Sequence, residues 1–401
     1  MSDPGTDVVG PADGTATSSR REMSEGGFTG ELPGPVQAAA PARRPGSVRR
    51  TSNLDVTRRT GSSGSFSPVA SIVGSARDLL TVGGPARAVV LGTARLGVTI
   101  DESGAISGVE QDPGDPSCAP LVGVRSGFGF RSSTKDLLTA LDGSLLGLLV
   151  DDLSGAPAPS GYASIRERKL GGETVELPPP TPVALPTGGF DPSVLPPGFD
   201  LASLPAGVDL AALAAMAGRA STQTDVCAGW RAQGIPTRRR QEGRELPFDD
   251  EPPLAPSLVS DDDEAWHDMA ELAPGQTRRI RRLDLTPDGD VLLADVMFRD
   301  SIVDPDGTPR VVHEYAVSAT IDRSTLAIRT IHADPRALPF VTDCPLAADS
   351  AAFLVGETVH DLRRRVKQIS RGPASCTHLN DLYRSMADIA VLADALDSVR
   401  S

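Results

Sequence analysis

Two cysteines at predicted helix starts are the residues of this sequence best placed to do chemistry. Cys344 precedes a proline, and Cys376 stands two residues before His378. We expect a helix to begin after each cysteine, because proline favours the first helical turn and Ser375 or Thr377 can cap the second helix. Free backbone N–H groups and the helix dipole lower the pKa of a thiol at such a position. Both cysteines are therefore candidates for thiolate chemistry.

A histidine on a predicted strand is the third feature of this kind. The alternation of side chains over residues 311–321 predicts the best strand in the chain, with His313 on its apolar face and Glu314 on the opposite face. A strand packed beneath two helices would bring its side chains close to the residues at both helix starts. We therefore expect one pocket to contain His313, Cys344, Cys376 and His378.

Two thiols and two imidazoles suit a metal ion. They are a familiar ligand set for zinc and also suit iron, so His313, Cys344, Cys376 and His378 form our candidate metal set. The chain has no CxxC or HxxxH spacing, and two residues is a short interval for two ligands of one ion. In the competing interpretation the cysteines are small buried residues, and His378 bonds to neighbouring backbone.

The same residues also predict an acid–base or nucleophilic site. Cys376 would be the nucleophile and His378 or His313 its base, while Glu314 and Asp300 could orient a histidine or accept its proton. In the alternative interpretation both carboxylates make surface ion pairs, which contribute little. A single histidine on an apolar strand face is also more often a core residue than a ligand.

Composition limits the classes of protein that this chain can belong to. Its 401 residues carry a formal charge of −14 and give a pI near 4.9, which argues against general nucleic-acid binding. Four cysteines are too few for a disulfide framework, so we expect a reducing cytoplasm. No signal-peptide core and no apolar run of about 18 residues is found, which argues against a membrane partner.

Shifts in composition divide the chain into four parts. Residues 1–45 are rich in Gly, Pro, Ser and Ala and are predicted to be disordered, and residues 171–222 form a Pro- and Gly-rich connector. The connector separates two predicted α+β halves, 46–170 and 223–401. In each half, antiparallel strands are followed by helices.

Within these halves, two segments have weaker patterns. Residues 68–81 have helical or loop-like spacing of apolar positions, and an extended piece is expected to begin at residues 160–163.

The order of short motifs indicates that the two halves are duplicated. Val98–Asp101 in the first half corresponds to Ala319–Asp322 in the second, and Asp112-Pro113 corresponds to Asp334-Pro335. If this hypothesis is correct, the cysteine and histidine set belongs to the second half alone. A scaffold half and a working half would show such a difference.

The second half resembles family 2889 of bacterial domains of unknown function. The matching pieces are Phe298–Ser301, Val312–Tyr315, Leu338-Pro339, Cys344-Pro345 and Cys376–Asp381, and pieces near residues 50, 150 and 160 resemble the longer actinobacterial members. The resemblance implies that His313, Cys344, Cys376 and His378 fall on the motif positions of the family. It implies no activity.

From these observations we expect a small-molecule enzyme or a metal-dependent accessory protein that uses a Cys/His site in its C-terminal half. Zinc and iron are the candidate cofactors, and a small molecule is the candidate ligand. The alternative is a non-catalytic interaction or assembly module in which the cysteines and histidines are structural.

Overall fold

The computed structural model describes residues 34–59, 69–83, 87–114, 116–127, 129–173, 224–248, 251–259 and 262–398. The predictions made for residues 1–33 and 174–222, which cover most of the N-terminal tail and of the connector, lie outside these ranges. Among the helices that are described, none is long and apolar enough to span a bilayer.

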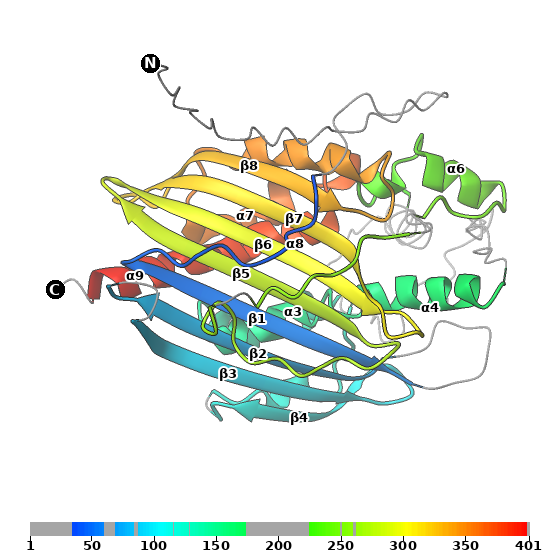
Figure 1. The fold of residues 1–401 in the computed structure, drawn as a ribbon, viewed down its shortest axis with the longest axis horizontal. Coiled ribbons are helices and arrows are strands. Elements are labelled where there is room, and N and C mark those ends of the chain that lie inside the picture. The colour runs from blue at the N-terminus through cyan, green and yellow to red at the C-terminus, as the bar shows by residue number, and fades with distance from the viewer. Residues whose placement is uncertain are drawn as a thin grey trace, which may run out of the picture. The chain divides into compact units, whose positions relative to one another are not determined.

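Eight strands form one antiparallel sheet in the order β4-β3-β2-β1-β5-β6-β7-β8 (Figure 1). The strands are β1 (Ser47–Arg58), β2 (Val69–Thr81), β3 (Ala88–Ile100), β4 (Ile106–Asp112), β5 (Thr277–Asp288), β6 (Val291–Val303), β7 (Pro309–Asp322) and β8 (Ile328–Ala337). This sheet, together with the helices, confirms the predicted α+β class. Because β1 pairs with β5, the strands of both halves belong to one continuous sheet.

Each set of four strands is followed by helices. We name β1–β4 the N-terminal half-sheet and β5–β8 the C-terminal half-sheet. Between them lie η1 (Ala119–Leu121), α1 (Phe130–Ser133), α2 (Lys135–Ala140), α3 (Leu145–Asp152), α4 (Ala158–Leu170), η4 (Ala228–Trp230) and α6 (Ile235–Gln241). After β8 follow η5 (Cys344–Leu354), η6 (Val359–Asp361), α7 (Leu362–Ile369), η7 (Gly372–Ala374), α8 (Thr377–Ser385), η8 (Met386–Asp388) and α9 (Ile389–Ser398).

The two half-sheets share the position of a β-bulge. Between β2 and β3 the register shifts after Asp78, which pairs with Gly92. Between β6 and β7 the register shifts after Asp300, which pairs with His313. An extra residue at equivalent places in two meanders is a specific feature, because bulges bend a strand and redirect its side chains. It makes Gly92 and His313 equivalent positions.

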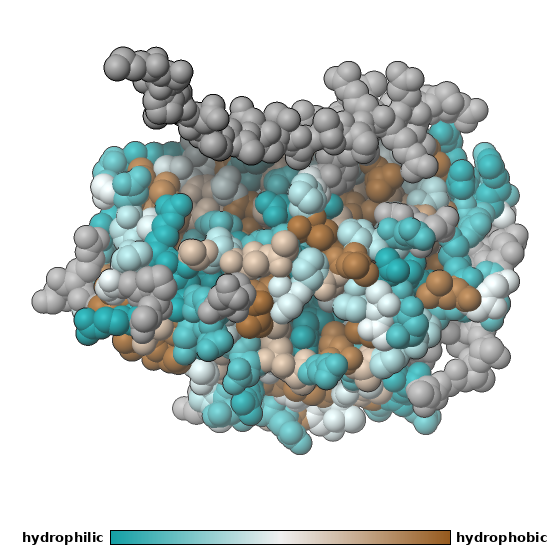
Figure 2. All heavy atoms as spheres, in the orientation of Figure 1, coloured by the Kyte–Doolittle hydropathy of each residue, from teal (hydrophilic) through white to brown (hydrophobic). Residues whose placement is uncertain are grey.

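Helices cover one face of the sheet and extended segments cover the other (Figure 1). The largest apolar cluster joins residues of β5–β8 to helix residues such as Leu382 and Met386, all of them buried. On the opposite face, Trp266 of the segment before β5 packs against Ile280 and Met297. The face seen in Figure 2 carries hydrophilic and hydrophobic residues side by side. We refer below to the helix face and the loop face.

Two of the weaker sequence predictions are wrong. Residues 69–81 form strand β2, whose alternate positions Ile72, Ala76 and Asp78 are buried. Their small and charged side chains concealed the two-residue period. The stretch expected to be extended from residue 160 lies inside helix α4, which has Pro157 as its N-cap and Pro159 in its first turn, and which packs on β6.

His267 fixes the loop face to the centre of the sheet. Its Nδ1 lies 2.7 Å from the hydroxyl of Thr51, and its Nε2 lies 2.8 Å from the side-chain oxygen of Asn53. Burial, with smaller contributions from Arg77 and Arg278, lowers the pKa of His267 to about 3. The ring is therefore neutral in the folded protein at neutral pH.

This shift predicts acid sensitivity. An unfolded His267 binds a proton below about pH 6.5, whereas the folded one does not until about pH 3, so its stabilising contribution is complete above 6.5 and is lost as the pH falls. Between pH 7 and pH 5 we expect the wild type to lose about 2 kcal/mol more unfolding free energy than His267→Gln. Urea titrations at both pH values measure the difference. Equal losses in the two proteins would contradict the prediction.

Candidate metal centre

A bulge on β7 brings the first two residues of the site together. Asp300 on β6 pairs directly with His313 on β7, and the register shift follows immediately. Both side chains point to the helix face. The carboxyl group of Asp300 is completely buried, and the side chain of His313 is 11% exposed.

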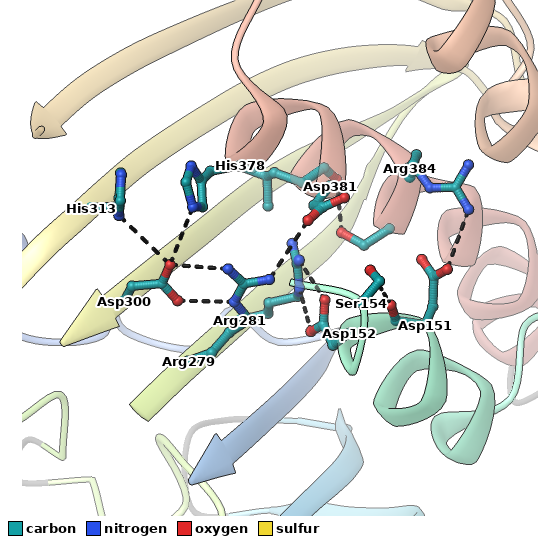
Figure 3. A network of polar contacts seen from close by, with 12 residues as sticks. Asp151, Asp152, Ser154, Arg279, Arg281, Asp300, His313, His378, Asp381 and Arg384 are labelled. Carbon is teal, nitrogen blue, oxygen red and sulfur yellow. Dashed lines mark hydrogen bonds and ion pairs between the residues drawn. The ribbon is translucent and has the colours of Figure 1, made fainter. Parts of the chain in front are cut away.

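Helix α8 supplies the third residue. Cys376 is the N-cap of α8, and its carbonyl accepts a hydrogen bond from the backbone N–H of Asn380 at 2.8 Å. His378, in the first helical turn, therefore points down toward the sheet (Figure 3). Its ring stacks on His313 with the centroids 3.8 Å apart. The expected cap from Ser375 is not formed, because the hydroxyl of that residue donates to the carbonyl of Gly372.

The three side chains converge through one oxygen and two nitrogens. Oδ2 of Asp300 lies 3.7 Å from Nδ1 of His313 and 3.8 Å from Nε2 of His378. One ligand atom from each residue lies within 4.8 Å of the others, and within the described part of the chain no other group of three His, Cys, Asp or Glu residues meets this criterion. Nδ1 of His313 is buried and has no hydrogen-bond partner among the described residues.

Arg279 on β5 holds the carboxylate in place. Its Nε and Nη2 donate to the two oxygens of Asp300 at 2.9 and 3.0 Å, and its Nη1 lies 3.6 Å from Asp381 of α8 (Figure 3). The guanidinium also lies over the ring of Phe298, 4.9 Å from its centroid. Gly155 leaves room for it, since a Cβ there would lie 2.2 Å from Nη1 of Arg279. A bidentate pair of this kind fixes the orientation of Asp300.

A second arginine links the site to the N-terminal half of the chain. Arg281 on β5 donates to both oxygens of Asp152 at the end of α3, at 2.6 Å each. Like Arg279, Arg281 places its guanidinium over the ring of Phe298, 5.0 Å from the centroid. The site thus rests on a network of charges that both halves of the chain contribute (Figure 3).

The electrostatic environment keeps both imidazoles neutral. Burial, with smaller contributions from Arg279 and Arg281, lowers the pKa of His378 to about 3. Burial also lowers the pKa of His313 well below its usual value, and the neighbouring His378 contributes to the shift. Neutral imidazole is the form of histidine that coordinates metals. At pH 7 both imidazoles of the cluster are therefore neutral.

Cys376 lies next to this cluster, outside its three ligand atoms. Sγ of Cys376 is 3.8 Å from Nδ1 of His378, and burial raises the pKa of this thiol. The expected lowering at a helix start is thus wrong, because burial outweighs the nearby N–H groups. Cys344 is buried in the large apolar cluster, and burial raises the pKa of its thiol well above the usual value. Among the described residues, the group of side chains close enough to hold one metal ion includes neither Cys344 nor Cys376.

Glu314, the other predicted acid–base residue, lies on the loop face. It accepts a hydrogen bond from Nε of Arg299 at 2.5 Å and another from the backbone N–H of Gln37 at 2.6 Å. Because neighbouring residues of a strand point to opposite faces, the sheet separates it from His313. The structure therefore brings together His313, His378 and Cys376, and directs Glu314 elsewhere.

Asp300 has a larger place in this site than the sequence indicated, and a repeated dipeptide could have shown it. Arg77-Asp78 on β2 and Arg299-Asp300 on β6 occupy equivalent positions at the two bulges. In the N-terminal half-sheet, Asp78 also receives a bidentate arginine, Arg50, at 2.8 and 2.7 Å. The residue opposite it, however, is Gly92, so the imidazole is missing there.

Residues 276–392 match the family model described as a protein of unknown function (DUF2889). This stretch contains the C-terminal half-sheet and all three residues of the cluster, which agrees with the resemblance drawn from the sequence motifs. No curated protein and no solved structure matches the chain.

Proposed function

We propose that this chain, whose C-terminal half resembles a family of unknown function, binds a divalent transition metal through Asp300, His313 and His378. The observation that supports the proposal is the convergence of three ligand atoms within 4.8 Å of one another, with the Asp300 oxygen beyond hydrogen-bond length from both histidine nitrogens. A metal about 2.1 Å from each donor would separate the donors by about 3.4 Å in a tetrahedron. Small movements of the two rings would be enough to reach that geometry.

The donor set favours zinc or ferrous iron. Two imidazoles and one carboxylate bind zinc in several hydrolases and iron in non-haem oxygenases. Three protein ligands leave coordination positions free for a solvent molecule or a substrate, as in catalytic sites rather than in closed structural ones. The side chain of His378 is 16% accessible, and we expect an ion to enter the site from this side.

Charge indicates the kind of small molecule such a centre would take. Asp300 and Arg279 form a neutral pair, so a divalent ion would bring two uncompensated positive charges into a buried place. Hydroxide or an anionic group of a substrate would balance them. We therefore propose an enzyme or accessory protein that acts on a small molecule bearing a carboxylate or a similar anionic group.

Residues that contact the metal ligands without binding the metal would affect its affinity. Arg279 fixes Asp300, and the Cys376 thiol faces the second nitrogen of His378. Partners of this kind orient metal ligands, and their loss commonly weakens metal binding by about 10–100-fold. In this role Cys376 acts as a neutral thiol, which is consistent with the raised pKa that burial gives it.

Metal analysis of the purified full-length chain tests the proposal. We expect about one zinc or iron per chain after reconstitution, and a loss of affinity greater than about 100-fold in His313→Ala and in His378→Ala. The matched control is His332→Ala, which removes an exposed histidine of β8 and should keep the metal.

Three outcomes would count against this assignment. A wild-type chain without a tight metal site would refute it, as would full occupancy in His378→Ala. Loss of metal in Cys376→Ser to the same extent as in the histidine variants would make the sulfur a ligand and replace the proposed set. If the metal is absent and the Cys376 thiol resists alkylation, the cluster is structural. That result would favour the alternative of a non-catalytic interaction or assembly module.

A further inference from the structure

One edge of the sheet is only partly covered. Strand β4 pairs with residues 95–100 of β3, and within the described part of the chain no segment pairs with residues 88–94 on that side (Figure 1). Three consecutive aliphatic residues of this stretch are exposed: Val89 at 49%, Val90 at 51% and Leu91 at 41%. A bare apolar edge strand is a template on which another extended chain can pair.

The equivalent edge in the C-terminal half-sheet shows what such a segment looks like. Residues 252–256 lie along the start of β7, where the N–H of Ala255 donates to the carbonyl of Pro309 at 2.9 Å. The N–H of Val311 donates to the carbonyl of Pro253 at 2.8 Å. Counting from the shared bulge, Pro309 and Val311 correspond to Ala88 and Val90. The same two bonds are therefore available on β3.

Charge indicates the composition of the missing segment. Arg87 and Arg95 stand at the two ends of the bare stretch, and both are exposed. In the sequence, the segment that covers β7 is preceded by acidic residues at 249–251 and followed by acidic residues at 261–264. Acidic residues at both ends of an apolar centre would complement the two arginines.

We propose that residues 88–94 of β3 bind an extended peptide of a partner protein by strand addition. The peptide has an aliphatic or proline-containing centre between acidic ends. Main-chain hydrogen bonds to β3 would give affinity, and contacts with Val89, Val90 and Leu91 together with the two arginines would give specificity. This surface is separate from the proposed metal centre.

A second copy of the chain fits this edge poorly. Antiparallel pairing of two β3 edges about Leu91 would place Arg87 of each copy opposite Arg95 of the other. Like charges directly opposite one another destabilise a strand pair. An acidic peptide avoids this repulsion and gains from the same two side chains.

Fluorescence anisotropy with the full chain tests this inference. The probe is a labelled synthetic peptide with the sequence of residues 249–263, which contains the internal segment and its acidic flanks. We expect saturable binding that weakens at least tenfold in the double variant Arg87→Glu/Arg95→Glu. The matched control, Arg44→Glu/Arg238→Glu, makes the same change of charge at two exposed arginines elsewhere and should alter affinity less than twofold.

A second measurement locates the peptide. Hydrogen exchange should show new protection of the Val90 amide when the probe is bound, and Leu91→Lys should remove it. The inference fails if the probe does not bind, if both double variants bind equally, or if protection appears elsewhere. It also fails if sedimentation shows a dimer that Leu91→Lys abolishes, because the occupant would then be a second copy.

Discussion

Replacing Arg279 by methionine should destabilise the protein by roughly 3–5 kcal/mol. The substitution leaves the carboxylate of Asp300 completely buried without its cation, beside two neutral imidazoles. Asp381 is less affected, because Arg131 remains 2.8 Å from it. Urea unfolding at pH 7 measures the loss directly.

Two further variants make this result interpretable. Arg329→Met removes ion pairs to Asp290 and Asp322 from a side chain that is 41% exposed, so it should destabilise the protein far less than Arg279→Met does. Arg279→Met combined with Asp300→Leu should regain most of the stability, because removing both charges leaves none uncompensated. A single variant as mild as the surface control would show that water reaches Asp300.

The metal proposal adds a distinctive signature to this experiment. A divalent ion held by the two histidines would supply the positive charge that Arg279→Met removes. Saturating zinc should therefore recover part of the lost stability in this variant, and none in the variant that also lacks Asp300. If zinc stabilised both proteins equally, Asp300 would not be a ligand of the ion.

Patterns of side chains were enough to predict much of the second half of the chain. The period of two over residues 311–321 placed His313 and Glu314 on opposite faces, and the structure shows the same division. The helix start after Cys376 was also predictable, because the stretch combines a glycine, a proline and capping residues ahead of an apolar period. These are local signals, and they fix the direction of a side chain along its own element.

Partnership between elements was harder to predict. Asp300 was recognised as a neighbour of His313, yet its bidentate bond to Arg279 depends on the register between β5 and β6. The environment of Cys376 shows the same limitation in energetic terms. A helix start lowers the pKa of an exposed thiol, but packing against the sheet removed the solvent, and burial raised the pKa instead.

The residue opposite the aspartate at the shared bulge distinguishes the two half-sheets. Both contain the arginine–aspartate pair at the bulge, Arg50 with Asp78 and Arg279 with Asp300. Only the C-terminal one has an imidazole opposite the carboxylate, since Gly92 occupies the other place. The common order of strands and common bulge are what the duplication hypothesis predicts. The histidine would then be the addition that turned a structural ion pair into a candidate site.

Arg281→Met provides the second large expected effect, because this residue joins the halves. Arg281 pairs with Ser52 in the β1–β5 register, at the centre of the sheet, and its side chain reaches Asp152 of α3. Both partners are 4% exposed, so the single substitution leaves a buried carboxylate without its cation. We expect Arg281→Met to lower the free energy of unfolding by roughly 3–5 kcal/mol. Adding Asp152→Leu should restore most of this stability, because no buried charge is then left without a partner.

The readout that distinguishes this effect from that of Arg279 is local. Arg281 does not contact Asp300, so Arg281→Met should keep its metal while amide protection in α3 falls. Arg279→Met should show the opposite pattern, in which metal binding weakens while amide protection in α3 is retained. The double-mutant cycle between Arg281 and Asp152 then measures how strongly the helix of one half is held by the sheet of the other. A coupling energy near zero would mean that packing, rather than this ion pair, joins them.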